Sequence, residues 1–110
     1  MDDEMYDTLE EMVSYRKNVT GVDHTLFISP KGHGRHGPRL KVAIVPSDSL
    51  DPRSQVAVIA FNGRVVAGEI APDLLRQVRQ FITRNEQVLL DYWDYRIDTD
   101  ELRQRLRPIG

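Results

Sequence analysis

Apolar residues recur with a period of two in the middle of the chain. Residues 39–46 read RLKVAIVP, so every second side chain falls on the same face, as in a strand with two different faces. Runs rich in β-branched and aromatic residues at 25–30, 56–61 and 64–70 predict three more strands. These four strands follow one another with short connections and no helix between them. We therefore expect an antiparallel sheet.

The dipeptide Asn62-Gly63 separates the last two of these strands. Asn and Gly together tolerate positive φ at both central positions of a type I′ turn, which joins the strands of many two-residue hairpins. The sequence therefore predicts a tight hairpin of that type.

From Pro72 onward the apolar period becomes that of an amphipathic helix. Pro72 suits the first helical position, and Asn85 lies on the apolar stripe, so we expect the helix to bend or pause there. Asp98 and Glu101 match the D-x-x-E start signal of a last short helix that ends before Pro108. The stripe consists of Leu74, Leu75, Val78, Phe81, Ile82, Leu89, Tyr92 and Trp93.

The start of the chain also shows helical spacing, because Met5, Leu9, Met12 and Val13 recur as on one helix face. Gly21 suits the C-terminal end of such a helix. This pattern predicts a short amphipathic N-terminal helix.

Together these elements predict one α+β domain over residues 1–110, a two-layer sandwich. It would consist of an acidic N-terminal helix and linker (1–22), a four-stranded antiparallel sheet (23–70), and a helical part (71–110) with one long and one short helix. The chain has no cysteine, no basic and apolar leader, and no apolar run near the ~20 residues that span a bilayer. We therefore expect a cytoplasmic protein without a membrane partner.

Charge is strongly segregated, although the formal net charge is only −2. Residues 1–11 contain six acids and no Lys or Arg, whereas residues 31–41 contain four Lys or Arg and no acid. Such blocks create local fields that select partners. Two arrangements remain open: the acidic segment covers the basic loop, or both blocks are simply solvated.

The basic block contains KGHGRHGP (31–38), which admits several interpretations. Its two histidines, with His24 upstream, suggest a metal site, but three or four ligands in an ordered setting are required. Its glycines and cations suggest an anion contact, although no phosphate-binding motif is present and a strand follows the loop. A mobile, charged connection between two strands is the third interpretation.

The chain also resembles a family of small bacterial proteins of unknown function. Members share a His/Pro-rich strand–loop–strand start, a second hairpin, and a helix with a characteristic tryptophan. The resemblance covers about residues 25–109, and it implies gene neighbourhoods like those of toxin–antitoxin pairs. The matching helix positions are Leu75, Val78, Phe81, Ile82, Asn85, Leu89, Leu90 and Trp93, with Ile109 at the closing apolar position.

From these features we predict a small, non-enzymatic binding module without cofactor, in which the basic loop contacts nucleic acid or an acidic protein. The alternative is a metal-assisted or His-based hydrolase, such as a nuclease, in which His33 and His36 act as ligands or as acid and base. The chain would be a monomer, or a homodimer through an exposed hairpin edge. The expected contact residues are Lys31, His33, Arg35, His36, Arg39 and Lys41.

Overall fold

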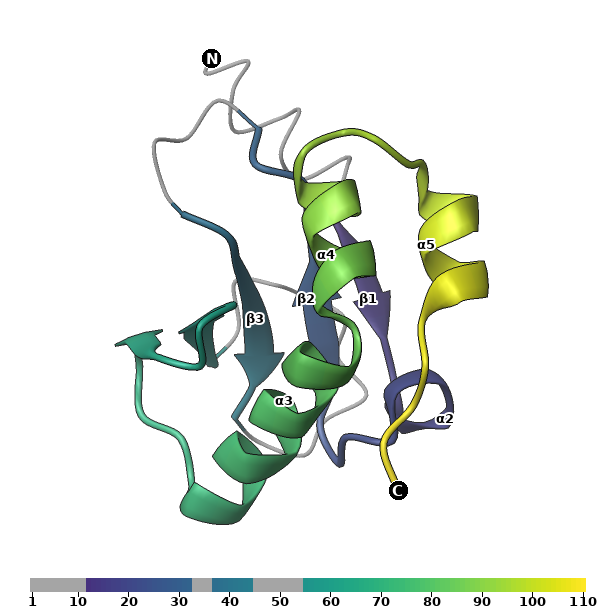
Figure 1. Cartoon of the computed structure of the whole chain (residues 1–110). Coiled ribbons are helices and arrows are strands. Elements are labelled where there is room, and N and C mark those ends of the chain that lie inside the picture. Colours follow the sequence, from purple (N-terminus) through teal and green to yellow (C-terminus); the bar gives the residue numbers. More distant parts are fainter. Residues whose placement is uncertain (1–11, 33–36, 45–54) are drawn as a thin grey trace.

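The computed structural model describes residues 12–32, 37–44 and 55–110. These residues form an α+β fold, as predicted, with five antiparallel strands in the order β1-β2-β3-β4-β5 (Figure 1). The strands are β1 (Val13–Tyr15), β2 (Leu26–Ile28), β3 (Arg39–Ala43), β4 (Val56–Ala60) and β5 (Val65–Ala67). The helices are α2 (Lys17–Thr20), α3 (Pro72–Arg84), α4 (Glu86–Trp93) and α5 (Thr99–Arg105). The predicted number of four strands is therefore wrong: β2 to β5 correspond to the predicted strands, and β1 is a fifth one.

The predicted N-terminal helix is wrong where the structure describes it, because residues 13–15 form β1. This strand pairs with β2, with Val13 opposite Ile28 and Tyr15 opposite Leu26. Valine and tyrosine favour strands, and pairing buries Tyr15 in the core. Only one helical turn, α2, follows before Gly21 ends it with φ of 77°. Residues 1–11, where the rest of the predicted helix lies, are outside the described residues.

The hairpin between β4 and β5 is present, but its turn is not of type I′. The Gly63 N–H donates to the Ala60 carbonyl (2.8 Å), and the Ala60 N–H donates to the Arg64 carbonyl (2.9 Å). Gly63 has φ of 90°, whereas Asn62 does not have positive φ. The connection is therefore a three-residue loop that ends in a glycine bulge. The Asn62 side chain supports it by accepting a hydrogen bond from the Arg64 N–H (3.0 Å).

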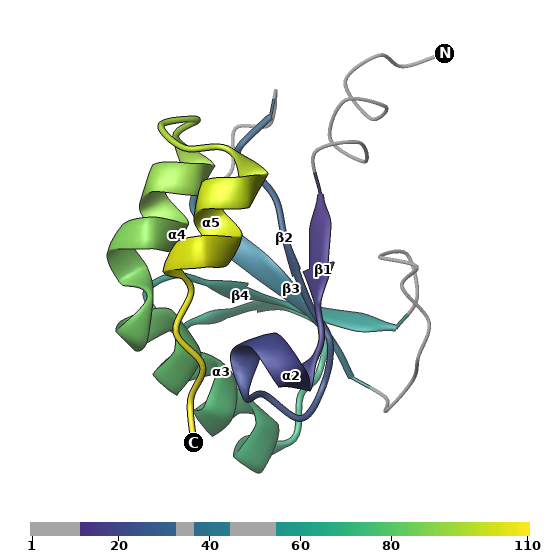
Figure 2. The same ribbon diagram turned by 90° about the vertical axis from the view of Figure 1, so that its right-hand side faces the viewer.

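The long C-terminal helix is two helices, α3 and α4, that meet at Asn85 as the sequence predicted. The short last helix is also confirmed, and the Asp98 carboxylate accepts a hydrogen bond from the Glu101 N–H (2.8 Å) at its start. These helices lie on one face of the sheet (Figure 2). No helix in the described part of the chain is long and apolar enough to cross a membrane.

The core lies between that face of the sheet and the helices. Alternate residues of β3 and β4 point into it, and the apolar stripe of α3 and α4 meets them. The opposite face carries Arg39 and Lys41 on β3, which are half-buried. The largest fully buried side chains are Phe81, Leu26, Ile28, Leu40, Ile59, Ile82, Leu89 and Leu102.

The segment after α5 is held against two distant parts of the chain. The Ile109 N–H donates to the Thr20 carbonyl (2.9 Å). The Asn85 side chain bonds both the N–H and the carbonyl of Arg107 (2.7 and 2.9 Å). A side chain at Gly21 would collide with the Ile109 carbonyl, so glycine is required there for this contact as well as for its positive φ.

Candidate functional site

The basic loop connects β2 to β3, and the structure describes its two ends. Lys31 and Gly32 belong to the first end, and Gly37 and Pro38 to the second. His33, Arg35 and His36, three of the six predicted contact residues, lie outside the described residues. The positions of Lys31, Arg39 and Lys41 can therefore be compared with the prediction.

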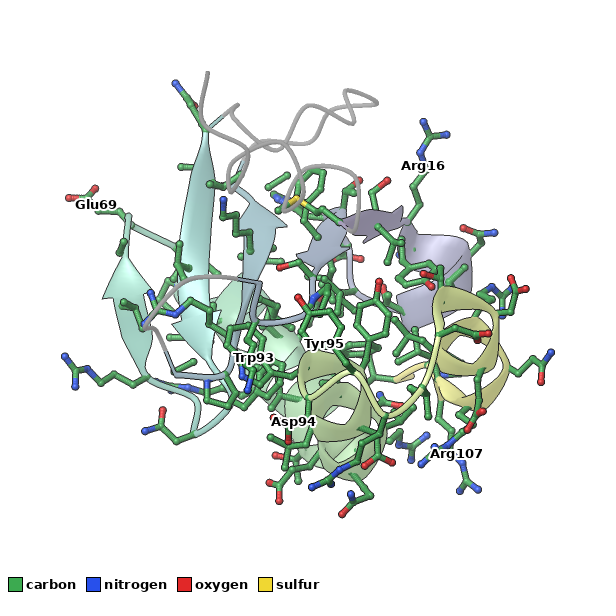
Figure 3. The ribbon with its side chains drawn as sticks, turned by 90° about the horizontal axis from the view of Figure 1, so that it is seen from above. Arg16, Glu69, Trp93, Asp94, Tyr95 and Arg107 are labelled. Carbon is green, nitrogen blue, oxygen red and sulfur yellow. The ribbon has the colours of Figure 1, made fainter. Side chains whose placement is uncertain are left out.

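The first end of the loop is fixed to the end of α4. The Lys31 N–H donates to the Trp93 carbonyl (3.1 Å), and the Gly32 N–H donates to the Tyr95 hydroxyl (2.9 Å). Trp93 is buried, whereas the Lys31 side chain is exposed. Figure 3 shows Trp93 and Tyr95 close together near this end of α4. The core thus holds the backbone from which the cationic side chain of Lys31 extends.

The second end of the loop is fixed to the β4–β5 hairpin. The Phe61 N–H donates to the Pro38 carbonyl (3.0 Å). The ring of Phe61 meets the ring of Trp93 edge-on, with 6.3 Å between centroids. Both ends of the loop are therefore attached to residues of one buried aromatic pair. The interpretation as a mobile connection does not hold for these ends, and the middle of the loop lies outside the described residues.

Tyr95 is the residue beside the loop that most departs from ordinary geometry. It has φ of 62°, the left-handed region that non-glycine residues rarely adopt, and half of its surface (50 %) is exposed. Tyr92 and Trp93, which the apolar stripe of the helical region predicted to be buried, are buried. The backbone conformation of Tyr95 had no signal in the sequence. It brings the hydroxyl to the start of the loop.

Arg39 and Lys41 lie apart from Lys31, on the sheet face that α3, α4 and α5 do not cover. Arg39 donates from Nε to the Gly37 carbonyl (3.2 Å). Lys41 is opposite Phe27 on β2 and Val58 on β4. The three described cations therefore form no single cluster: one is at the start of the loop and two continue along β3.

Of the three histidines considered for a metal site, the structure places only His24, because His33 and His36 lie outside the described residues. His24 precedes β2, whereas the loop follows it, so about 16 Å of extended chain separates His24 from Ser29 alone. The His24 imidazole Nδ1 lies 2.6 Å from the Ala43 carbonyl. In the described part of the chain, no three His, Cys, Asp or Glu side chains are grouped as metal ligands.

Several acids are engaged by neighbouring side chains. Hydrogen bonds from Lys17 and Gln77 lower the pKa of Asp23. The Asp91 side chain is only 14 % exposed. Its carboxylate accepts from Gln87 and Arg105, and these hydrogen bonds lower its pKa. These carboxylates therefore already have partners.

A second basic surface, which the sequence reasoning missed, lies on the helical side of the molecule. Shallow depressions there are lined by exposed arginines from four places: the β4–β5 hairpin, α3, the end of α5 and the segment after α5. The helical period of α3 gave a partial signal, since Arg76, Arg79 and Thr83 fall on the polar side of its apolar stripe. Only the fold shows that the other arginines join them.

Comparisons of the chain with protein-family models, with curated proteins and with solved structures found no match.

Proposed function

We propose that the chain is a small cytoplasmic, non-enzymatic module that binds an anionic partner through the basic loop 31–41. The observation that carries this proposal is the attachment of both loop ends to the Phe61–Trp93 pair. Fixed ends restrict the positions that a loop can adopt, so less conformational entropy is lost when a partner binds.

The charges near the loop support an anionic partner. Within the described residues, Lys31, Arg39 and Lys41 form no ion pair with an acid. Residues 31–41 contribute four Lys or Arg and no acid. Tyr95 adds an exposed aromatic ring beside the loop, and such a ring suits stacking on a base or contact with a protein.

The test is a titration followed by amide NMR signals. Single-stranded RNA, single-stranded DNA, duplex DNA and an acidic peptide are added separately at low salt. We expect the largest shifts at Lys31, Gly32 and Tyr95 with at least one of these ligands. Unchanged signals there with all four would contradict the proposal.

Matched variants separate the loop from general electrostatics. Lys31→Gln and Arg35→Gln each remove one charge from the loop, and Arg103→Gln removes one from the exposed side of α5. We expect the loop variants to weaken binding several-fold and the α5 variant to leave it within twofold. Equal losses would indicate that the loop is not a specific contact.

The resemblance to paired-gene families adds a further part to the proposal: the partner is encoded beside this chain, as in toxin–antitoxin pairs. Co-expression with the neighbouring gene product, followed by co-purification through a tag on either protein, tests this part. The hydrolase alternative has no specific support from the residues that the structure describes, and we do not develop it.

A further inference from the structure

Four exposed arginines form what we call the arginine band: Arg64, Arg79, Arg84 and Arg107. Arg64 follows the β4–β5 turn, Arg79 and Arg84 are on α3, and Arg107 follows α5. The fold brings them together, because α3 lies beside the C-terminal segment in both views (Figures 1 and 2) and because Arg79 bonds to the hairpin.

The band differs from other basic positions in its partners. Lys17, Arg76, Arg96 and Arg105 each form an ion pair with an acid. No member of the band forms one within the residues that the structure covers. Arg79 and Arg84 instead donate to backbone carbonyls, those of Gly63 and Pro108 (both 2.9 Å). These bonds position two guanidinium groups without neutralising them.

The band is continuous along three shallow depressions. The one at the hairpin and the one on α3 share Arg79 and Thr83. The one on α3 and the one beside α5 share Arg84. A linear ligand could therefore contact all four arginines in sequence.

The lining indicates the chemistry of that ligand. Besides arginines, it offers Gln80, Thr83, Gln87 and Gln104, all exposed hydrogen-bonding side chains, and the one acidic side chain among the described lining residues is that of Glu86. Protein interfaces usually have an apolar or aromatic centre, and the one aromatic ring in this lining, Phe61, is buried. Guanidinium groups match phosphate oxygens, and interfaces with nucleic acids are polar and positively charged.

Arg79 and Arg84 are five residues apart on α3, so they leave the helix about 140° apart around its axis. Arg79 extends to the β4–β5 turn and Arg84 to the segment after α5, so α3 joins the two ends of the band. The band also begins beside the basic loop, because Phe61, which holds Pro38, belongs to the same turn as Arg64.

We propose that the arginine band binds the sugar–phosphate backbone of a nucleic acid, without reading its sequence. This inference deepens the proposed function by naming the class of partner. It rests on that function only where the nucleic acid would continue from the band onto the basic loop. Binding should depend little on base sequence, because guanidinium contacts to phosphates carry no sequence information.

Binding of fluorescent 20-nucleotide RNA, single-stranded DNA and duplex DNA at 50 to 200 mM salt tests the inference. Four phosphate contacts predict a slope of log K against log salt of about −3.6 for duplex and −2.8 for single strands. The affinity should then fall about 50- to 150-fold over this range, and it should differ little between base sequences.

The decisive variant is Arg64→Gln/Arg107→Gln, because neither side chain makes a hydrogen bond or ion pair that the described structure needs. It should reduce the magnitude of the slope by about 1.4 to 1.8. The control Arg96→Gln/Arg103→Gln removes equal charge near α5 and should leave the slope unchanged. Equal effects of both pairs would overturn the inference.

Loop variants distinguish the two proposals. If Lys31→Gln/Arg35→Gln abolishes binding while the band variant does not, the loop function stands and the band inference fails. The reverse result supports the band and contradicts the loop. Binding of an acidic peptide without binding of any nucleic acid would also overturn the inference.

Discussion

Tyr15 and Asn85 are both buried polar residues, but only the side-chain polar groups of Asn85 have hydrogen-bond partners among the described residues. The Asn85 side chain is 3 % exposed and donates to the Phe81 and Arg107 carbonyls while it accepts from the Arg107 N–H. The Tyr15 hydroxyl, in contrast, has no hydrogen-bond partner among the described residues. A buried polar group without a partner costs free energy that a paired one does not.

Tyr15→Phe should therefore leave the free energy of unfolding unchanged or raise it by up to about 1 kcal/mol. The ring still fills the core, and only the unpaired hydroxyl is lost. Urea unfolding measures this difference. Tyr92→Phe is the comparison, because its hydroxyl lies 3.2 Å from the Thr99 hydroxyl, and its loss should destabilise the protein.

The same variant has a pH signature. Burial, with a smaller contribution from Tyr92, raises the pKa of Tyr15 above 10. The folded state thus favours the neutral hydroxyl of Tyr15. The stability that this preference contributes is complete below pH 10, and it is lost as the pH rises through the pKa of the folded state. As the pH rises above 10, the free energy of unfolding should fall less in the Tyr15→Phe variant than in the parent protein. A marked destabilisation at pH 7 would show that the hydroxyl has a partner, such as a buried water.

At the scale of elements, Asn85 joins α3 and α4 to the segment after α5. One of its three side-chain hydrogen bonds goes to the Phe81 carbonyl in the last turn of α3, and the other two hold Arg107, a member of the arginine band. The hydrogen bond from the Arg84 guanidinium to the Pro108 carbonyl acts on the same segment (2.9 Å). This junction therefore links the stability of the fold to the geometry of the band.

Asn85→Ala should destabilise the protein by about 2 kcal/mol, since it leaves backbone groups of Phe81 and Arg107 without these partners. Hydrogen exchange should rise at the Arg107 and Ile109 amides in particular. Gln80→Ala, at an exposed position of α3, is the control and should change stability by less than about 0.5 kcal/mol. An Asn85→Ala protein with unchanged exchange at these amides would show that other contacts hold the segment.

Local sequence patterns predicted most helices and strands. They did not predict β1, which is a strand because it pairs with β2. The apolar period of α3 and α4, the pause at Asn85 and the alternation in β3 are local properties. The sequence VSY at 13–15 also fits a helical pattern, and only pairing with β2 makes it a strand. Likewise, all six predicted contact residues of the loop lie within residues 31–41 of the sequence. The arginine band instead combines a hairpin, a helix and a C-terminal segment that only the fold brings together.

The whole molecule divides its charge more sharply than its net value suggests. All 15 Lys and Arg residues lie beyond residue 11, while six of the 17 acids lie in residues 1–11. Residues 12–110 therefore carry a formal net charge of +4, and the complete chain carries −2. Negative charges repel the phosphates of a nucleic acid at a distance. The acidic segment should therefore oppose binding wherever it lies.

Deleting residues 2–11 should therefore raise nucleic-acid affinity, by about tenfold at 50 mM salt, because it removes six negative charges from the field that a phosphate chain encounters. At 300 mM salt the Debye length falls well below 10 Å, so the gain should shrink to less than twofold. Fluorescence anisotropy across this salt range measures both values. A full-length variant with all six acids replaced by Asn or Gln separates charge from chain length. It should match the deletion, whereas parent-like affinity in that variant would show that the segment acts by its bulk and not by its field.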